Sequence, residues 1–285
     1  MENDMIVRHL TNLGLRLARL FSAVIVVGFA GIAPQLQAAE DDFDSYKIKI
    51  TGYWFHAEPS GTLEGANDIG TIDLTKDLGF NAYSTLTGKV DWKFTRKHHL
   101  YFVVTPTDFS RQTVLTRTID FQGQTFVAGL ATQSELRVNL YGPGYQYDII
   151  RRRRGHLGIA AQLDLIDTRA SITGTLQVNG GGAKQGTVSS SGSFLAPIPV
   201  LGPEFRLYIN RRVYFQGNVY GMYLFGYGNF LSSSGSLGVQ LAKHVGLNVG
   251  YQLGSRLTVN NNSSSDRIGL RLTQKGAIVG LEFPF

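Results

Sequence analysis

The chain has 285 residues, a formal net charge of +6 and no cysteine, which excludes disulfide bonds and any metal or thiol chemistry that depends on cysteine. Only 17% of the residues are charged, whereas 34 are glycine and 11% are aromatic. This composition favours β structure with tight turns over a disordered chain, and the length suits one domain of medium size.

The first forty residues have the pattern of a secretory signal peptide. Three arginines precede an apolar run over 20–33, and the small-residue ending QLQAAE follows. A basic region, a short apolar core and an alanine-flanked cleavage site define such peptides. The alternative is an uncleaved anchor helix, but fourteen apolar residues are short for a membrane span. We predict a cleaved signal peptide over 1–39, ending at Ala38 or Ala39, and one exported domain over 40–285.

The exported part shows repeated period-2 alternation, which is the mark of strands with two different faces. In TLTGKVDWKF, Leu86, Val90 and Trp92 share one face, whereas Lys89 and Asp91 share the other. Most such segments reach the 9–11 residues with which a tilted strand crosses a bilayer. The predicted strands are 46–56, 81–94, 99–111, 131–150, 156–169, 197–209, 213–227, 235–242, 245–258 and 267–285. A short extra hairpin would fit in 57–80 or 170–196.

The connections alternate in length. Short basic links, TRKH, RRRRG, NRR and KH, alternate with longer polar loops over 57–80, 112–130, 170–196, 228–234 and 259–266. Membrane barrels have short periplasmic turns and longer extracellular loops. We therefore predict that the four consecutive arginines, Arg151, Arg152, Arg153 and Arg154, form a periplasmic turn facing anionic lipid headgroups or narrowing the mouth of the lumen. Export makes nucleic acid an improbable partner for them.

The chain ends in GAIVGLEFPF, with Phe283 and Phe285 on one face of the last segment. This ending resembles the closing strand of bacterial outer-membrane β-barrel proteins. The resemblance implies an all-β, transmembrane, antiparallel up-and-down barrel in the outer membrane of a Gram-negative cell, and a terminal aromatic residue that the barrel-assembly machinery reads. A second likeness, GTIDLTKDLGFN followed by KVDWKFTRKHHLYF, is to uncharacterised, porin-like outer-membrane barrel families with no assigned activity.

The expected barrel has about ten strands, with eight to twelve compatible with the pattern. The competing fold is a soluble β-sandwich or lipocalin-like barrel, which buries its apolar face inside. Long strands and alternating loop lengths favour the membrane barrel.

If lipid takes the apolar faces, the polar faces line the lumen. Candidate lumen residues are Lys89, Asp91, Lys93, Glu135, Arg137, Asp164, Glu204 and Arg206. Opposite charges in a confined interior are expected to pair, because an unpaired buried charge is costly. A barrel of ten strands is close to the eight that side chains fill and far from the sixteen that leave an aqueous pore. The two predictions are a salt-bridged network and a narrow polar path.

The residues that favour catalysis are few. His98, His99, His156 and His244 fall at predicted periplasmic turns, where a solvated or interfacial role is the simpler interpretation. His56 lies near the outer rim beside Glu58 and an acidic loop carrying Glu64, Asp68, Asp73 and Asp77. A rim histidine with carboxylates could support hydrolysis. This arrangement resembles some outer-membrane proteases, but their paired acidic motifs are absent, and a Ser–His lipid hydrolase would need a facing serine.

Neither a metal nor a cofactor is predicted. The acidic loop lacks the spacing of an EF-hand, and GGGAKQG lacks the ending of a phosphate-binding loop. The first prediction is a structural barrel or a narrow passive channel for small solutes, with extracellular loops able to bind ligands. The alternatives are a hydrolase acting on envelope lipid or peptide, and an adhesin or receptor acting through its loops. Outer-membrane lipid and, during insertion, the assembly machinery are the expected partners.

Overall fold

The computed structural model describes residues 42–64, 71–121, 124–176, 186–224, 228–260 and 269–285. The expected signal peptide over 1–39, Asp68 of the acidic loop and most of GGGAKQG lie outside these residues. No helix in the described part is long and apolar enough to cross a bilayer.

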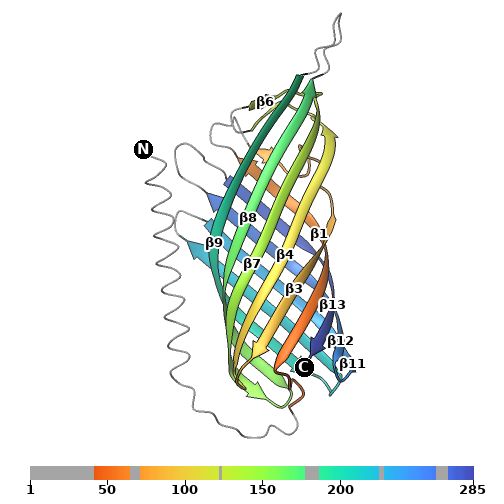
Figure 1. Cartoon of the computed structure of the whole chain (residues 1–285), viewed down its shortest axis with the longest axis vertical. Helices are drawn as coiled ribbons and strands as arrows, with labels where there is room; N and C mark the ends of the chain where they lie inside the picture. Colours follow the sequence, from red (N-terminus) through yellow and green to blue (C-terminus); the bar gives the residue numbers. More distant parts are fainter. Residues whose placement is uncertain (1–41, 65–70, 122–123, 177–185, 225–227, 261–268) are drawn as a thin grey trace, which may run out of the picture. The chain divides into compact units, whose positions relative to one another are not determined.

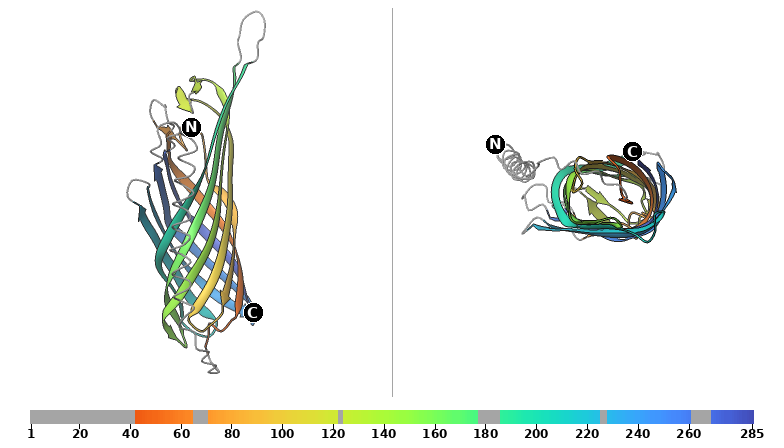
Figure 2. Two further views of the ribbon diagram at one scale, coloured as in Figure 1. Left: turned by 60° about the vertical axis from the view of Figure 1, so that its left-hand side comes forward. Right: turned by 90° about the horizontal axis from the view of Figure 1, so that it is seen from below.

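Ten long antiparallel strands form a closed barrel (Figure 1). They are β1 (Ile48–Glu64), β3 (Tyr83–Lys93), β4 (His98–Val114), β7 (Ala131–Arg152), β8 (Gly155–Leu176), β9 (Gly186–Tyr208), β10 (Val213–Leu224), β11 (Gly228–Ala242), β12 (Val245–Asn260) and β13 (Gly269–Pro284). Each pairs with its neighbour along the chain, and β13 pairs with β1 to close the sheet. Seen from below, the strands form a closed ring (Figure 2, right).

The ten predicted strands are confirmed, and their main error is in length. The expected 197–209 strand begins at Gly186, and the expected 235–242 strand begins at Gly228, so the predicted loop over 228–234 is part of β11. An extra hairpin exists, but it is β5 (Ile119–Phe121) with β6 (Gln124–Phe126) inside the predicted 112–130 loop. In the 57–80 segment the described residues form a two-residue strand, β2 (Ile72–Asp73), beside the end of β1.

The barrel has two distinguishable ends. The four short connections, over 94–97, 153–154, 209–212 and 243–244, lie at the same end as Phe285. Short turns mark the periplasmic end of bacterial barrels, so this end is called periplasmic below and the opposite end extracellular.

A belt of apolar side chains covers the outer wall next to the periplasmic end. Its exposed members include Ile50, Trp54, Leu86, Val90, Trp92, Phe102, Ile159, Leu207, Leu237, Val249 and Leu281. A contiguous apolar surface of this kind is foreign to a soluble protein and suits a lipid bilayer. This belt excludes the soluble sandwich and the lipocalin-like barrel, which would hide these side chains inside.

Several strands are longer than a bilayer requires, so part of the barrel extends beyond it. β7 and β8 have 22 residues each and β9 has 23, about twice the 9–11 residues of a spanning strand. Above the apolar belt the outward residues become polar, as with Asp108, Arg137 and Arg169, because water replaces lipid outside the wall.

In the same extracellular part, the inward residues become apolar and form one cluster, the extracellular core. The segments over 71–80 and 115–130 fold into the mouth and contribute Leu74, Phe80, Ile119, Phe121 and Phe126. Inward residues of the wall complete it: Leu63, Phe109, Leu136, Val138, Ile166, Ile172, Ile198, Val200, Phe230, Leu257, Leu270 and Leu272. The barrel is therefore stabilised at this end like a soluble protein, by apolar side chains packed inside it.

We expect the belt to tolerate charge poorly. Val249 is 55% exposed in the middle of the outward face of β12, and an arginine there would face hydrocarbon. Val249→Arg should lower the free energy of unfolding by about 2–4 kcal/mol in lipid vesicles, measured by denaturant titration. Gln133→Arg, on the outward face of β7 above the belt, is the matched control and should change it little; equal effects would contradict the assigned membrane level.

Candidate functional site

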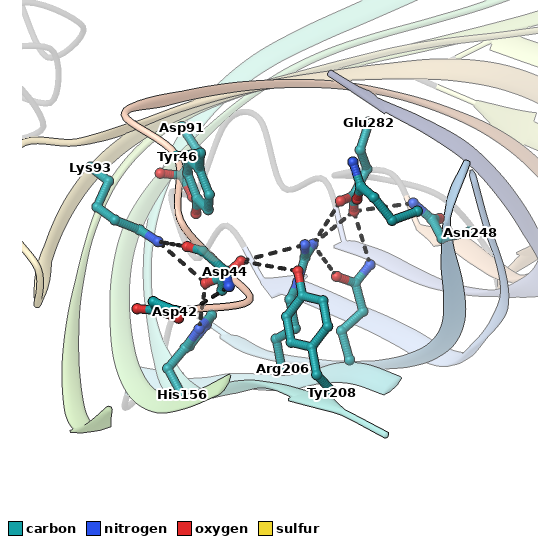
Figure 3. A network of polar contacts seen from close by, with 12 residues as sticks. Asp42, Asp44, Tyr46, Asp91, Lys93, His156, Arg206, Tyr208, Asn248 and Glu282 are labelled. Atoms are coloured by element: carbon teal, nitrogen blue, oxygen red, sulfur yellow. Dashed lines mark hydrogen bonds and ion pairs between the residues drawn. The ribbon is translucent and has the colours of Figure 1, made fainter. Parts of the chain in front are cut away.

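The periplasmic half of the lumen contains a group of charged side chains gathered around the N-terminal segment. Residues 42–47 precede β1 and lie in the periplasmic mouth, where Asp42 and Asp44 project among side chains from several strands (Figure 3). We call this segment and its ion pairs the periplasmic clamp.

Asp44 is the centre of the clamp. Its carboxylate lies 3.2 Å from Lys93 Nζ, 3.1 Å from His156 Nδ1 and 3.7 Å from Arg206 Nη1. These partners come from β3, β8 and β9, which lie on different parts of the wall. Burial alone would raise the pKa of Asp44, but Lys93, His156 and Arg206 hold this pKa well below its ordinary value. Asp44 is therefore an anion that joins the N-terminal segment to three strands.

Arg206 extends the network to the closing strand. Its Nη2 donates to both carboxylate oxygens of Glu282 on β13, at 2.8 and 2.9 Å, and its guanidinium lies 4.4 Å from the ring centre of Tyr214. Asn248 Nδ2 donates to Glu282 at 3.2 Å. Arg206 and Glu282 are almost completely buried, so each neutralises a charge that would otherwise be very unfavourable inside the barrel.

His99 joins two further carboxylates beside the Asp44 group, and its ring centre lies 6.0 Å from that of His156. Its Nδ1 is 3.1 Å from Asp91 and its Nε2 is 3.2 Å from Asp148, and all three side chains are buried. Tyr46 of the N-terminal segment donates its hydroxyl to Asp91 at 3.2 Å. Because both ring nitrogens face carboxylate oxygens, the geometry fits an imidazolium that donates on both sides.

The arginine quartet divides between the lumen and the surface. The side chain of Arg151 is only 4% exposed and contacts Asp42 and Asp148, both at 2.8 Å. Arg152, Arg153 and Arg154 are exposed at the turn. Gly155 ends this turn with φ +132°, and a Cβ there would meet the Arg206 carbonyl oxygen, so the glycine is required by both conformation and space. One arginine therefore belongs to the clamp and three belong to the surface.

Between the clamp and the extracellular core lies a chamber of about 270 Å³. Its lining includes many hydroxyl and amide side chains: Thr51, Thr87, Gln162, Gln216, Asn218, Ser232, Ser234, Ser236, Gln252, Ser255 and Gln274. One ion pair crosses it, from Lys89 to Glu204 at 3.4 Å, and Tyr220 donates to Glu204. The chamber thus offers many neutral hydrogen-bonding groups beside the Lys89–Glu204 pair, and Lys49, Asp164 and Arg206 also reach its wall.

Six of the eight candidate lumen residues lie inside the barrel: Lys89, Asp91, Lys93, Asp164, Glu204 and Arg206. Glu135 and Arg137 do not, because their side chains are exposed on the outer wall and Leu136 and Val138 take the inward positions. The prediction for these two was wrong because β7 continues beyond the bilayer, where the polar face points out to water.

Several clamp residues were missed or assigned elsewhere from the sequence. His99 and His156 were expected at solvated or interfacial turns, yet both are buried. Asp42, Asp44 and Glu282 were not singled out at all. One available signal was the acidic stretch EDDFD shortly before the first strand, because its carboxylates complement the four basic links between predicted strands.

Asp73 and Asp77 of the acidic loop accept hydrogen bonds from residues of the extracellular loop segments. Asp77 receives two hydrogen bonds from the Arg117 guanidinium, at 2.9 Å from Nε and 2.5 Å from Nη2. Asp73 accepts the backbone N–H groups of Thr75 and Lys76, both at 2.9 Å. The Arg117 contacts join the 71–80 segment to the 115–130 segment, whereas the Asp73 contacts lie within the 71–80 segment.

The rim histidine and its neighbouring carboxylate face outward. His56 and Glu58 are both exposed on the outer face of β1. His56 therefore does not point toward Asp73 and Asp77, whose contacts lie within the loop segments.

Removal of Arg206 should destabilise the barrel strongly. Arg206→Ala would leave Glu282 buried without its cation, and such losses cost about 3–5 kcal/mol. Denaturant unfolding, followed by tryptophan fluorescence, measures the change. Arg212→Ala, in the exposed 209–212 turn, is the control and should change little. The double variant Arg206→Met, Glu282→Leu should recover part of the lost free energy of unfolding. If it is destabilised as much as Arg206→Ala, the unpaired Glu282 charge is not the cause of the destabilisation.

Acid should release the extracellular loop segments. Burial tends to raise the pKa of Asp77, but hydrogen bonds from Arg117 and from the Asp73 N–H lower it below its ordinary value. Because the folded-state pKa is depressed, this stabilisation is complete above the ordinary carboxyl range and is lost as the pH falls below about 4. Amide exchange over 71–80, corrected for intrinsic rates, should therefore accelerate at pH 3. Arg117→Gln should accelerate it already at pH 7, whereas protection that survives both changes would contradict the role of this pair.

Comparison with known proteins supports the fold and leaves the activity open. No known protein family matches the sequence, and neither does any curated protein. Among solved structures, the outer membrane protease OmpT from Escherichia coli is similar over 85% of this chain and 100% of its own, with a TM-score of 0.51 and 11% identity. Weaker matches include the toluene transporter TodX from Pseudomonas putida, with 9% identity, 86% and 91% coverage and a TM-score of 0.36. Another is the attachment invasion locus protein Ail from Yersinia pestis, with 8% identity, 83% and 99% coverage and a TM-score of 0.38.

At such low identity these matches concern the fold. A closed ten-strand antiparallel barrel with an apolar outer belt is the architecture of integral membrane barrels. By this architecture, the chain is an integral β-barrel protein of the bacterial outer membrane.

Proposed function

We propose that this chain is a structural outer-membrane barrel whose lumen is filled, so that it does not conduct solutes in the conformation described. The observation that carries the proposal is that both mouths are occupied. The periplasmic clamp lies in one mouth, and the extracellular core with its two loop segments lies in the other.

The energetics of the two closures support a stable, filled state. Separating Asp44 from Lys93, His156 and Arg206 would leave buried charges without partners, which is expensive. Opening the other mouth would expose apolar side chains such as Phe80, Phe121 and Phe126 to water at about 25 cal/mol per Å². A filled interior is also what small barrels normally have.

The proposed role includes contacts with the envelope. Lipid is the expected partner of the apolar belt, and exposed Arg152, Arg153 and Arg154 suit anionic headgroups at the periplasmic surface. Phe283 and Phe285 are exposed at the end of the closing strand, where an assembly factor could reach them. An adhesin or receptor role for the extracellular extension stays a prediction.

The central chamber favours a second candidate function, a narrow passage for small uncharged polar solutes. Its lining of hydroxyl and amide groups would replace the hydration of a polyol, and the Lys89–Glu204 pair carries no net charge. On this second proposal the clamp acts as a plug whose departure opens the chamber to the periplasm.

Proteoliposome swelling in isosmotic ribose or urea distinguishes these functions. The wild-type barrel and Asp44→Asn, which weakens the clamp, are compared with Asp108→Asn, a control that removes an exposed carboxylate from the outer wall. The structural proposal expects no swelling with any of the three. Swelling confined to Asp44→Asn would favour the plugged passage, and rapid swelling with the wild type would overturn the filled barrel. The heat-dependent shift in gel mobility verifies that each variant is folded.

A further inference from the structure

The outer wall carries a serine and a histidine in direct contact. His56 on β1 and Ser84 on β3 are register partners, and His56 Nδ1 lies 3.0 Å from Ser84 Oγ. Both side chains are exposed on the outer face. The imidazole ring stacks on the Trp54 ring, with 5.6 Å between the ring centres and 16° between the planes, and this stacking supports its orientation toward Ser84. This contact supplies the facing serine that a Ser–His hydrolase requires.

The pair lies at the level of the membrane where lipid esters are found. The outward residues on its periplasmic side, Trp54 on β1 and Leu86 on β3, are exposed and belong to the apolar belt. On its extracellular side the next outward residue of β1 is Glu58, which pairs with Lys275 at 3.6 Å. The acyl esters of a lipid lie at this boundary, between the hydrocarbon and the headgroup. An ester in the outer leaflet could therefore reach Ser84 without leaving the membrane.

The backbone beside Ser84 offers a donor for a developing negative charge. Lys93 donates its N–H toward the β1 side, to Lys47 O at 2.8 Å. N–H groups alternate between the two sides of a strand, so Ser84, an odd number of residues earlier, directs its N–H toward β4. The ladder between β3 and β4 stops at Gly88–Val104, where the next bonded pair would be Leu86 with Pro106, which has no N–H. Ser84 therefore lies beyond the paired part of this ladder, with its N–H directed toward the interruption, where an oxyanion could accept it.

We propose that Ser84 and His56 form a nucleophile–base pair that hydrolyses acyl esters of outer-leaflet lipids. Ser84 Oγ would attack the ester carbonyl carbon while His56 accepts the hydroxyl proton, and the ester C–O bond would break as that proton passes to the leaving alcohol. Water, deprotonated by His56, would then attack the acyl-serine carbonyl carbon. The acyl C–Oγ bond would break as the proton passes from His56 to Ser84 Oγ, which releases the fatty acid and regenerates both side chains. The reaction needs no other reactant. Lys275, next to the pair on β13, is placed to contact the headgroup phosphate.

Two measurements on the full barrel in phosphatidylethanolamine vesicles test this proposal. The first is labelling by a fluorophosphonate, with the modified residue located by mass spectrometry. The second is the release of fatty acid. Labelling is expected at Ser84. Ser84→Ala should abolish both readouts, and His56→Ala should lower both by roughly 10²-fold or more, the usual contribution of a general base.

Ser193→Ala is the matched control, because Ser193 is an exposed serine on the outer wall of β9 outside this pair. It should leave both readouts unchanged, and all variants should keep the heat-dependent gel shift of a folded barrel. The proposal is overturned if the wild type shows neither labelling nor fatty-acid release. It is also overturned if the label is found equally on Ser193, or if release persists in Ser84→Ala. None of these results would affect the filled-barrel function, which is read from solute flux.

Discussion

The pairing of β13 with β1 is the interaction on which the rest of the structure depends. Sixteen residue pairs, from Lys49–Pro284 to Glu64–Gly269, join the last strand to the first. Without this ladder, two strand edges would expose backbone N–H and C=O groups to hydrocarbon, where each unpaired group costs several kcal/mol. Closure also creates an interior, and therefore a place where side chains from distant parts of the chain must meet. The clamp, the chamber and the extracellular core all follow from that enclosure.

The enclosure is filled differently at its two ends because its surroundings differ. Beside the apolar belt the outer wall takes the hydrophobic residues, so the inward positions are polar and must compensate one another. Asp44, Arg206 and Glu282 do so through ion pairs that cross from the N-terminal segment to the closing strand. Beyond the belt, water surrounds the wall and the inward positions become apolar. The same alternation therefore yields a charged lumen at one end and a packed apolar core at the other.

This change of surroundings also bears on function. The clamp and the extracellular core occupy the two mouths of the lumen, and the proposed structural role rests on this occupancy. The boundary between belt and water lies on the outer wall, and His56 and Ser84 are found together there. The two places where this barrel offers groups for binding or catalysis are therefore the outer wall near that boundary and the closed chamber.

The sequence by itself determined the ten strands, their antiparallel order and the positions of the short turns, because alternation, segment length and basic links are local properties. It also indicated that one face of a strand is apolar and the other polar. It did not determine the environment of each face: Glu135 and Arg137 share the parity of lipid-facing residues and lie outside, in water. The tertiary structure alone decided which charges meet. Asp44 contacts Lys93, His156 and Arg206, and Ser84 contacts His56, because closure and register set neighbours across the barrel, and no local pattern records them.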